Sequence, residues 1–336
     1  MRKRIKIAVI SLVLIVAVVS YELSYSELDT AADALECSVN ESDFIKWIDF
    51  TPTKEALSHA AKIDVETYGA KTHIRMYELL AVYSSNTGGS YKKYKNASLD
   101  AIREKYEDGS SLSDMTSNIK LLNYYLSAYE AVLGGFVGEY SILDSDGKLK
   151  EKKYGVRVFS PVADGFYYTH YDDFGASRSF GYKRSHLGHD LMGSTGTPII
   201  AIESGYVEAC GWNAYGGWRI GIRSFDGKRY YYYAHLRKGH PYNDIYEGKI
   251  VNAGEVIGYL GMTGYSTRED TNNIDTPHLH FGMQIIFDKS QKDGYNQIWI
   301  DLYSITTFLS SYKVAVKKTE NDYFSQRSYF YPVTPD

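Results

Sequence analysis

The sequence predicts a multi-domain α+β protein, in which an amino-terminal helical region precedes a mainly antiparallel β domain. Apolar residues recur at spacings of three and four through residues 26–138. Beyond residue 150, short runs rich in Val, Ile, Tyr and Phe are separated by glycine-containing turns. At 336 residues the chain is long enough for about two domains of ~100 to 200 residues. We therefore expect a helical domain over 22–140, a linker over 141–153, a β domain over 154–310 and a carboxy-terminal tail over 311–336.

Residues 1–21 are expected to form a signal anchor or a signal peptide. Basic residues at positions 2, 3, 4 and 6 precede an apolar run from Ile7 to Val19, and no acidic residue occurs before Glu22. The run is shorter than the ~20 residues of a spanning helix, and residues 17–20 form only a weak small-residue cleavage site. An uncleaved membrane anchor is favoured over secretion after signal cleavage. Either alternative places the bulk of the chain outside the cytoplasmic membrane, with the basic residues inside.

The helical region contains four periodic segments, at residues 53–68, 72–84, 98–106 and 113–133. Ser98 is a reasonable N-cap for the third of these. The region also contains several glutamates, and a glycosidase of the lysozyme type would need a carboxylate pair. No motif supports such a pair, so we predict that these glutamates lie on solvated helix faces: Glu55, Glu66, Glu78 and Glu130.

The β domain contains five strand-like runs, at residues 199–202, 206–209, 218–223, 229–235 and 279–286. The sequence Phe-Asp-Gly-Lys at 225–228 separates the third run from the fourth. Asp and Gly tolerate the positive backbone angles of a tight turn, so this stretch predicts a hairpin.

Net charge and cysteine content exclude two classes of protein. A net charge of −4 provides no basic surface of the kind that nucleic-acid binding requires, so nucleic acid is not an expected partner. The two cysteines, Cys37 and Cys210, cannot make a disulfide framework and lack the neighbouring ligands of a zinc thiolate site. We expect both to be structural or free.

Two histidine-bearing stretches carry the chemistry: HLGHD at His186–Asp190 and HLH at His278–His280. Together they offer the imidazoles and the carboxylate that a catalytic zinc uses when three protein ligands leave the fourth position to water. Because side chains alternate along a strand, His278 and His280 should share one face. The same count places His235 on one face with Tyr231 and Tyr233.

Further motifs surround these stretches in a fixed order. HLGHD is followed by GTPIIA at residues 196–201, YAHL at 233–236, and a glycine- and threonine-rich segment that leads into HLHF at 278–281. This ordered set closely resembles the lysostaphin and LytM type of zinc endopeptidases, with the pattern HxGxD, GTPV-A, YxHL and G-TG-ST-HLHF. The resemblance extends from Tyr154 to about Leu309.

The resemblance implies a compact antiparallel sheet with a groove on one face, the duplicated hybrid motif. It implies zinc ligands at His186, Asp190 and His280, and a non-ligand catalytic pair at His235 and His278. It also implies hydrolysis of stem or cross-link peptides of bacterial peptidoglycan by a cell-wall-facing enzyme. The alternative function is an exported wall-binding or scaffold protein with a preserved but latent site. The oligomeric state and the bond cleaved remain open.

Several neighbouring residues are expected to lie outside the catalytic set. His189 occupies the variable position of HLGHD and should be a neighbour of the site. The histidines outside the motifs are expected to be structural: His59, His73, His170 and His240. The clearest departure from the family pattern is an insertion at residues 268–276, which is either a tolerated surface loop or a rim that affects substrate choice.

Overall fold

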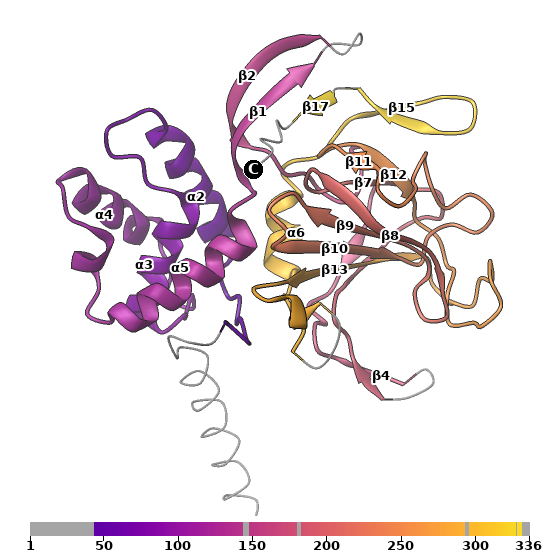
Figure 1. Cartoon of the computed structure of the whole chain (residues 1–336), viewed down its shortest axis with the longest axis horizontal. Helices are drawn as coiled ribbons and strands as arrows, with labels where there is room; N and C mark the ends of the chain where they lie inside the picture. The colour runs from indigo at the N-terminus through magenta and orange to yellow at the C-terminus, as the bar shows by residue number, and fades with distance from the viewer. Residues whose placement is uncertain (1–43, 144–147, 180–182, 293–295, 327, 331–336) are drawn as a thin grey trace, which may run out of the picture. The chain divides into compact units, whose positions relative to one another are not determined.

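The computed structural model describes residues 44–143, 148–179, 183–292, 296–326 and 328–330 (Figure 1). Residues 48–336 form one compact unit, separate from residues 1–47. The expected signal segment at residues 1–21 and Cys37 lie outside the described residues. Within the described ranges, no helix is long and apolar enough to cross a membrane.

Between residues 44 and 143, the helical region comprises four α-helices and a short 3₁₀ helix. Their bounds are α2 Lys54–Thr67, α3 Met76–Thr87, α4 Asn96–Glu107, η1 Leu112–Met115 and α5 Ile119–Leu133. The Thr53 hydroxyl accepts a hydrogen bond from the Ala56 amide and begins α2, whereas Gly88 ends α3 at a φ of 59°. Helix α4 begins before the predicted cap at Ser98. Asn118 caps α5, so the predicted segment 113–133 is divided into two helices.

The β domain contains an eight-stranded antiparallel sheet, in the order β11-β8-β9-β10-β13-β6-β3 with β14 paired to β13. Its strands are β3 Thr169–His170, β6 His189–Met192, β8 Gly205–Asn213, β9 Gly217–Ser224, β10 Arg229–Ala234, β11 Ile250–Val251, β13 His278–Ile285 and β14 Ile298–Trp299. Residues 225–228 connect β9 to β10, as predicted for a hairpin. The structure thus confirms helices followed by a mainly antiparallel β domain.

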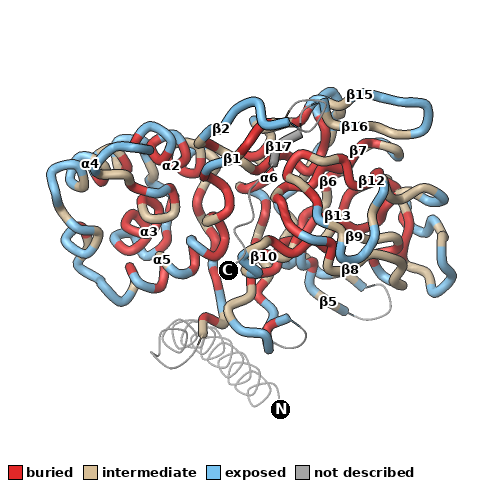
Figure 2. The backbone as a smooth tube through the Cα atoms, turned by 45° about the horizontal axis from the view of Figure 1, so that its top comes forward, coloured by how far each residue is buried: buried red, intermediate tan, exposed pale blue. Residues whose placement is uncertain are grey.

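Shorter elements lie outside this sheet. They are the pairs β7 Pro198–Ile200 with β12 Val256–Tyr259, β4 Ser177–Arg178 with β5 Arg184–Ser185, and β15 Val316–Lys318 with β16 Tyr323–Ser325, together with helices η2 Lys289–Gln291 and α6 Tyr303–Leu309. Strands β7 and β12 are buried along their whole length (Figure 2). The Tyr233 hydroxyl, on β10 of the large sheet, accepts a hydrogen bond from the Ile202 amide just beyond β7. The core therefore lies between the β7–β12 pair and one face of the sheet.

The expected linker and tail contain strands. Residues 141–153 include the end of β1 (Val137–Leu143) and most of β2 (Leu149–Val156), which pair as an antiparallel hairpin. In the tail, β17 (Ser328–Phe330) pairs with β1. Strand β2 is exposed along most of its length and carries alternating charges, so it lacks the apolar alternation that marks a strand in a sequence.

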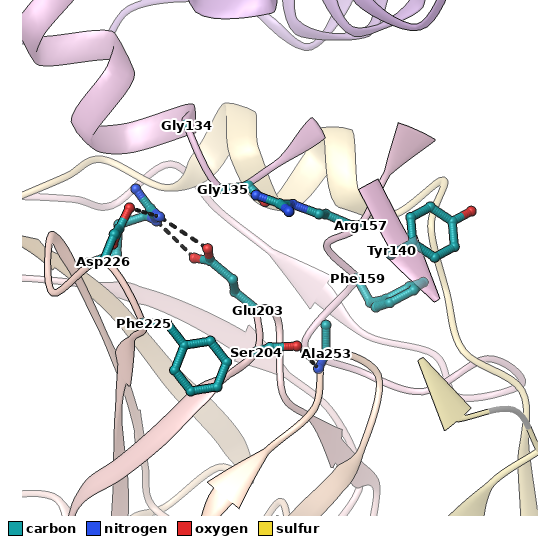
Figure 3. A pocket seen from close by; sticks show the side chains of 11 residues that line it. Gly134, Gly135, Tyr140, Arg157, Phe159, Glu203, Ser204, Phe225, Asp226 and Ala253 are labelled. Carbon is teal, nitrogen blue, oxygen red and sulfur yellow. Dashed lines mark hydrogen bonds and ion pairs between the residues drawn. The ribbon is translucent and has the colours of Figure 1, made fainter. Parts of the chain in front are cut away.

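Arg229 joins the helical region to the β domain. Its side chain is 1% exposed, and it donates hydrogen bonds to Glu203 over 2.8 and 3.1 Å and to Asp226 over 2.6 Å. It also donates to the Ala131 carbonyl near the end of α5 over 2.8 Å. Figure 3 shows Glu203 and Asp226 converging on one guanidinium beside a small cavity of about 110 Å³. The beginning of β10 is therefore fixed to α5.

Candidate metal centre and catalytic groove

The structure brings His186, Asp190 and His280 together from two parts of the chain. Asp190 on β6 lies directly opposite His280 on β13, and His186 precedes β6. His186 Nε2, Asp190 Oδ1 and His280 Nδ1 form a triangle with all three sides 3.0 Å long. Gly188 permits this approach, because a Cβ there would lie 2.5 Å from the His280 ring.

The triangle fits a tetrahedrally coordinated cation. Ligand atoms bound to zinc at ~2.0 to 2.1 Å with tetrahedral angles lie about 3.3 Å apart, slightly more than the distances observed. Two imidazole nitrogens that both face one carboxylate oxygen would repel each other if both carried protons. A cation between the three atoms would instead attract all three lone pairs. The donor set therefore suits a metal ion, and these three residues form the group in the described chain that could hold one.

A second layer of contacts orients two of these side chains. His186 Nδ1 lies 3.2 Å from both the carbonyl and a carboxylate oxygen of Asp173 and 3.1 Å from Arg178 Nη2, so these two residues hold the ring with Nε2 facing the triangle. Arg178 Nη2 donates to Asp173 over 2.6 Å and to Asp190 Oδ2 over 3.1 Å. Neither Asp173 nor Arg178 belongs to the sequence motifs. No pattern in the sequence marks them, because Asp173 lies in a loop and Arg178 lies in the two-residue strand β4.

Burial and hydrogen bonding act in opposite directions on Asp190. Burial disfavours its charged form, but hydrogen bonds with His186 and His280 outweigh that effect and hold the pKa of this carboxyl well below its usual value. Burial also lowers the pKa of His280. The site therefore favours an ionised carboxylate beside neutral imidazole, which are the forms that bind a metal.

His235 and His278 lie side by side next to the triangle. Their ring centroids are 4.8 Å apart, and His278 Nε2 lies 3.8 Å from Asp190 Oδ1. His235 Nδ1 lies 2.8 Å from the Thr263 carbonyl, and His278 Nδ1 lies 2.8 Å from the Thr276 carbonyl. Since a carbonyl only accepts, both rings carry the proton on Nδ1 and have an acceptor lone pair on Nε2. Burial, with a smaller effect of the neighbouring histidines, lowers the pKa of His235 to about 3, so this ring is neutral at neutral pH.

The predicted alternation holds for the histidines of β13 but fails for β10. Leu279 is fully buried, whereas His278 and His280 line the groove on the opposite face. On β10, however, Tyr231 and Tyr233 are fully buried in the core, and Tyr232 lines the groove. The strand ends at Ala234, and His235 adopts a left-handed φ of 61°. This backbone reversal turns His235 to the groove face, away from the face of Tyr231 and Tyr233.

These side chains line a groove of about 730 Å³. Its walls carry both charge signs, from residues that include Arg184, Glu208, Arg219 and Lys292, and its aromatic residues include Tyr215 and Trp299. The Arg184 guanidinium lies over the rings of Tyr215 and Tyr265, at 5.0 and 5.4 Å from their centroids. The groove is therefore polar, with aromatic walls beside the histidine cluster.

The insertion at residues 268–276 is anchored to the domain. Asp270 accepts hydrogen bonds from the Trp218 indole and the Gly239 amide, each over 2.8 Å. The Ile274 amide donates to the Met262 carbonyl, and the Ile274 side chain is buried. At least one acidic residue of the insertion is therefore engaged within the protein.

The remaining histidines contact other protein groups. His59, His73 and His240 each pair with an aspartate, at distances of 2.6 to 2.8 Å. His170 Nδ1 and His189 Nε2 lie 2.5 Å apart. Burial lowers the pKa of His189 to about 4, with a smaller effect of His170. His189 is thus directed away from the triangle, as a neighbour of the site. The other expected non-site residue, Cys210, is half-buried and free.

Comparison with known proteins agrees with this geometry. Residues 184–294 match Peptidase family M23. The L-Ala--D-Glu endopeptidase of Bacillus subtilis (strain 168) is 41% identical over 119 residues, which cover 34% of this chain and 34% of that protein. Lysostaphin of Staphylococcus simulans is 43% identical over 97 residues, which cover 29% of this chain and 17% of lysostaphin.

A solved structure of the lysostaphin catalytic domain from the same organism is 35% identical and covers 37% of this chain and 85% of that chain, with a TM-score of 0.29. The matches span about a third of the Bacillus relative and about a sixth of lysostaphin. Residues 184–294 therefore resemble Peptidase family M23, and the relatives that match this part of the chain include lysostaphin.

Proposed function

We propose that this chain is a zinc-dependent endopeptidase that hydrolyses peptide bonds in the stem or cross-link peptides of bacterial peptidoglycan. The 3.0 Å triangle of His186, Asp190 and His280, with two further imidazoles beside it, is the observation that carries the proposal. The names of the relatives support peptide hydrolysis, and one names a bond to a D-amino acid. We assign residues 154–310 as the peptidase unit and its sheet as the duplicated hybrid motif of the family.

The three triangle residues would hold the zinc ion, with Asp173 and Arg178 orienting His186 and Asp190. Bound zinc supplies a Lewis acid that polarises the scissile carbonyl and makes water more acidic. His235 and His278 supply the proton transfers. Each has an unprotonated Nε2 that can accept the proton of the attacking water and then donate it to the leaving amine.

The protonated form of either ring would also stabilise the negative charge on the tetrahedral oxygen. Both rings are held by Nδ1 donation to a backbone carbonyl, so they need little reorganisation during the reaction. No side chain is required as a nucleophile, and hydrolysis proceeds without an acyl-enzyme. We also propose that the domain acts outside the cytoplasmic membrane, facing the wall, with residues 1–21 as the membrane anchor.

Digestion of purified cell wall tests this function. The full chain loaded with zinc should clear purified peptidoglycan in a zymogram, and removal of the metal by a chelator should abolish clearing. Added zinc should restore it, because the ligand triangle is preformed. Wall binding without clearing under all three conditions would instead support the alternative, a wall-binding protein with a latent site.

Asp173 should affect metal affinity although it does not face the ion. Asp173→Ala should weaken zinc binding by about 10- to 100-fold, because His186 loses a carboxylate partner and Arg178 loses one of its two. Competition with a chromophoric chelator measures the affinity. Asp164→Ala is the matched control, since Asp164 is exposed and its carboxylate accepts a hydrogen bond from the neighbouring Gly165 amide. Unchanged zinc affinity in Asp173→Ala would show that the backbone carbonyl alone orients His186.

A further inference from the structure

The groove carries a second polar centre at Arg219 on β9. Arg219 pairs with Gly211 on β8, and its neighbour Ile220 pairs with Tyr233 on β10. The register therefore places Arg219 opposite Ala234, which pairs with His280, and His280 pairs with Asp190. Side chains in one such row share a face of the sheet, so Arg219 projects to the face that holds the two ligands.

The distance from this arginine to the ligands follows from the same row. Neighbouring strands lie ~4.7 to 4.9 Å apart, so the Arg219 and His280 backbones are separated by about 10 Å. The intervening side chain is the methyl group of Ala234, and both Arg219 and His280 line the groove. A peptide bound at the metal centre can therefore extend to Arg219 over a few residues of extended chain.

Arg219 differs from the other cations of the groove. Arg223 forms a bidentate pair with Glu208 over 2.9 and 3.1 Å, and Lys292 contacts the same carboxylate over 3.0 Å. Arg178 is paired with two aspartates. Within the described residues, the Arg219 guanidinium has neither a carboxylate nor an aromatic ring as a partner, and its buried Nε has no hydrogen-bond acceptor.

The surroundings of Arg219 are rich in tyrosine. Tyr230 and Tyr232 also line the groove, and the charge of Arg219 acts on both hydroxyl groups. Burial raises the pKa of Tyr230 to about 12, and the positive charge of Arg219 acts in the opposite direction. An unpaired guanidinium in a partly buried site binds an anion more strongly than one in bulk water does. Its planar fork matches the two oxygens of a carboxylate.

We infer that Arg219 binds a carboxylate of the substrate and selects peptides that carry a free carboxylate near the scissile bond. This inference rests on the proposed function and narrows its substrate class. A subsite of this kind would distinguish acidic stem peptides from uncharged peptides such as glycine bridges. Arg219 acts in binding, while His235 and His278 remain the groups that move protons.

A pair of matched peptides tests the inference. One peptide contains an L-Ala–D-Glu bond and the other contains an L-Ala–D-Gln bond. They differ only in one group, which is a carboxylate in the first peptide and a carboxamide in the second. The zinc-loaded full chain should show a kcat/KM at least ~10-fold higher for the carboxylate peptide, since a charge-assisted pair contributes that much. Arg219→Gln should remove this preference mainly through KM, and Arg219→Lys should retain part of it. Arg103→Gln, on the surface of the helical region, should leave the preference unchanged.

Calorimetric binding of the same peptides to the His278→Ala variant, with and without Arg219→Gln, separates the inference from the proposed function. Carboxylate-selective binding that depends on Arg219, together with no cleavage of either peptide by the unmutated zinc-loaded chain, would support the subsite and contradict the proposed hydrolysis. Cleavage of both peptides at equal rates, or a preference that survives Arg219→Gln, would overturn the subsite and leave the hydrolase intact. Circular dichroism of each variant confirms that it is folded.

Discussion

The His280→Ala and His278→Ala variants should separate metal binding from turnover, although the two residues lie on one face of one strand. His280→Ala removes one corner of the 3.0 Å triangle, so zinc affinity should fall by more than ~100-fold, beyond the effect expected for an outer partner of a ligand. His278→Ala should retain zinc, because its Nε2 lies 3.8 Å from Asp190 outside the triangle. It should lose ~10²- to 10⁴-fold in kcat, as expected for a general acid–base residue.

Zinc content by mass spectrometry and peptide hydrolysis by chromatography measure the two effects on the same samples. His240→Ala is a suitable control, since His240 pairs with Asp322 and does not line the groove. It should retain both zinc and turnover. Equal zinc loss in the two HLH variants would contradict the division of roles, and full turnover in His278→Ala would remove that residue from the mechanism.

The residues of the candidate site could be predicted from motifs, and part of their geometry could be predicted from strand periodicity. His186 and His280 are 94 residues apart, so only a family pattern relates them in the sequence. The alternation of β13 then places His278 and His280 on one face. The same alternation fails at His235, because its left-handed φ is a tertiary constraint that no local propensity predicts.

The elements and site residues that the sequence patterns do not predict are mainly polar. Strand β2 is exposed and charged, and β17 pairs with β1 across nearly 190 residues of chain, so neither has the apolar alternation of a buried strand. Asp173 and Arg178 likewise reach the site from a loop and a two-residue strand. In each case the position depends on contacts between distant segments. Periodicity reports burial within one segment and contains no information about such contacts.

Arg229→Met should produce the largest loss of stability among the variants considered. The arginine is buried and donates to Glu203, Asp226 and the Ala131 carbonyl, while Glu203 is itself only 12% exposed. Removing one partner leaves the other charge buried without compensation, which typically costs about 3 to 5 kcal/mol. Urea unfolding followed by circular dichroism measures this loss. Because Arg229 begins the strand that leads to His235, reduced hydrolysis should accompany it.

Two further variants distinguish the buried network from a general effect of losing an arginine. Arg103→Met breaks surface pairs with Glu66 and Glu107 and should cost no more than ~1 kcal/mol. Adding Glu203→Gln to Arg229→Met should recover part of the stability, because the uncompensated carboxylate is then removed. If Arg229→Met cost no more than Arg103→Met, Arg229 would not stabilise the junction between α5 and β10. The position of β10 would then depend on its strand pairing and on the core contacts of Tyr231 and Tyr233 alone.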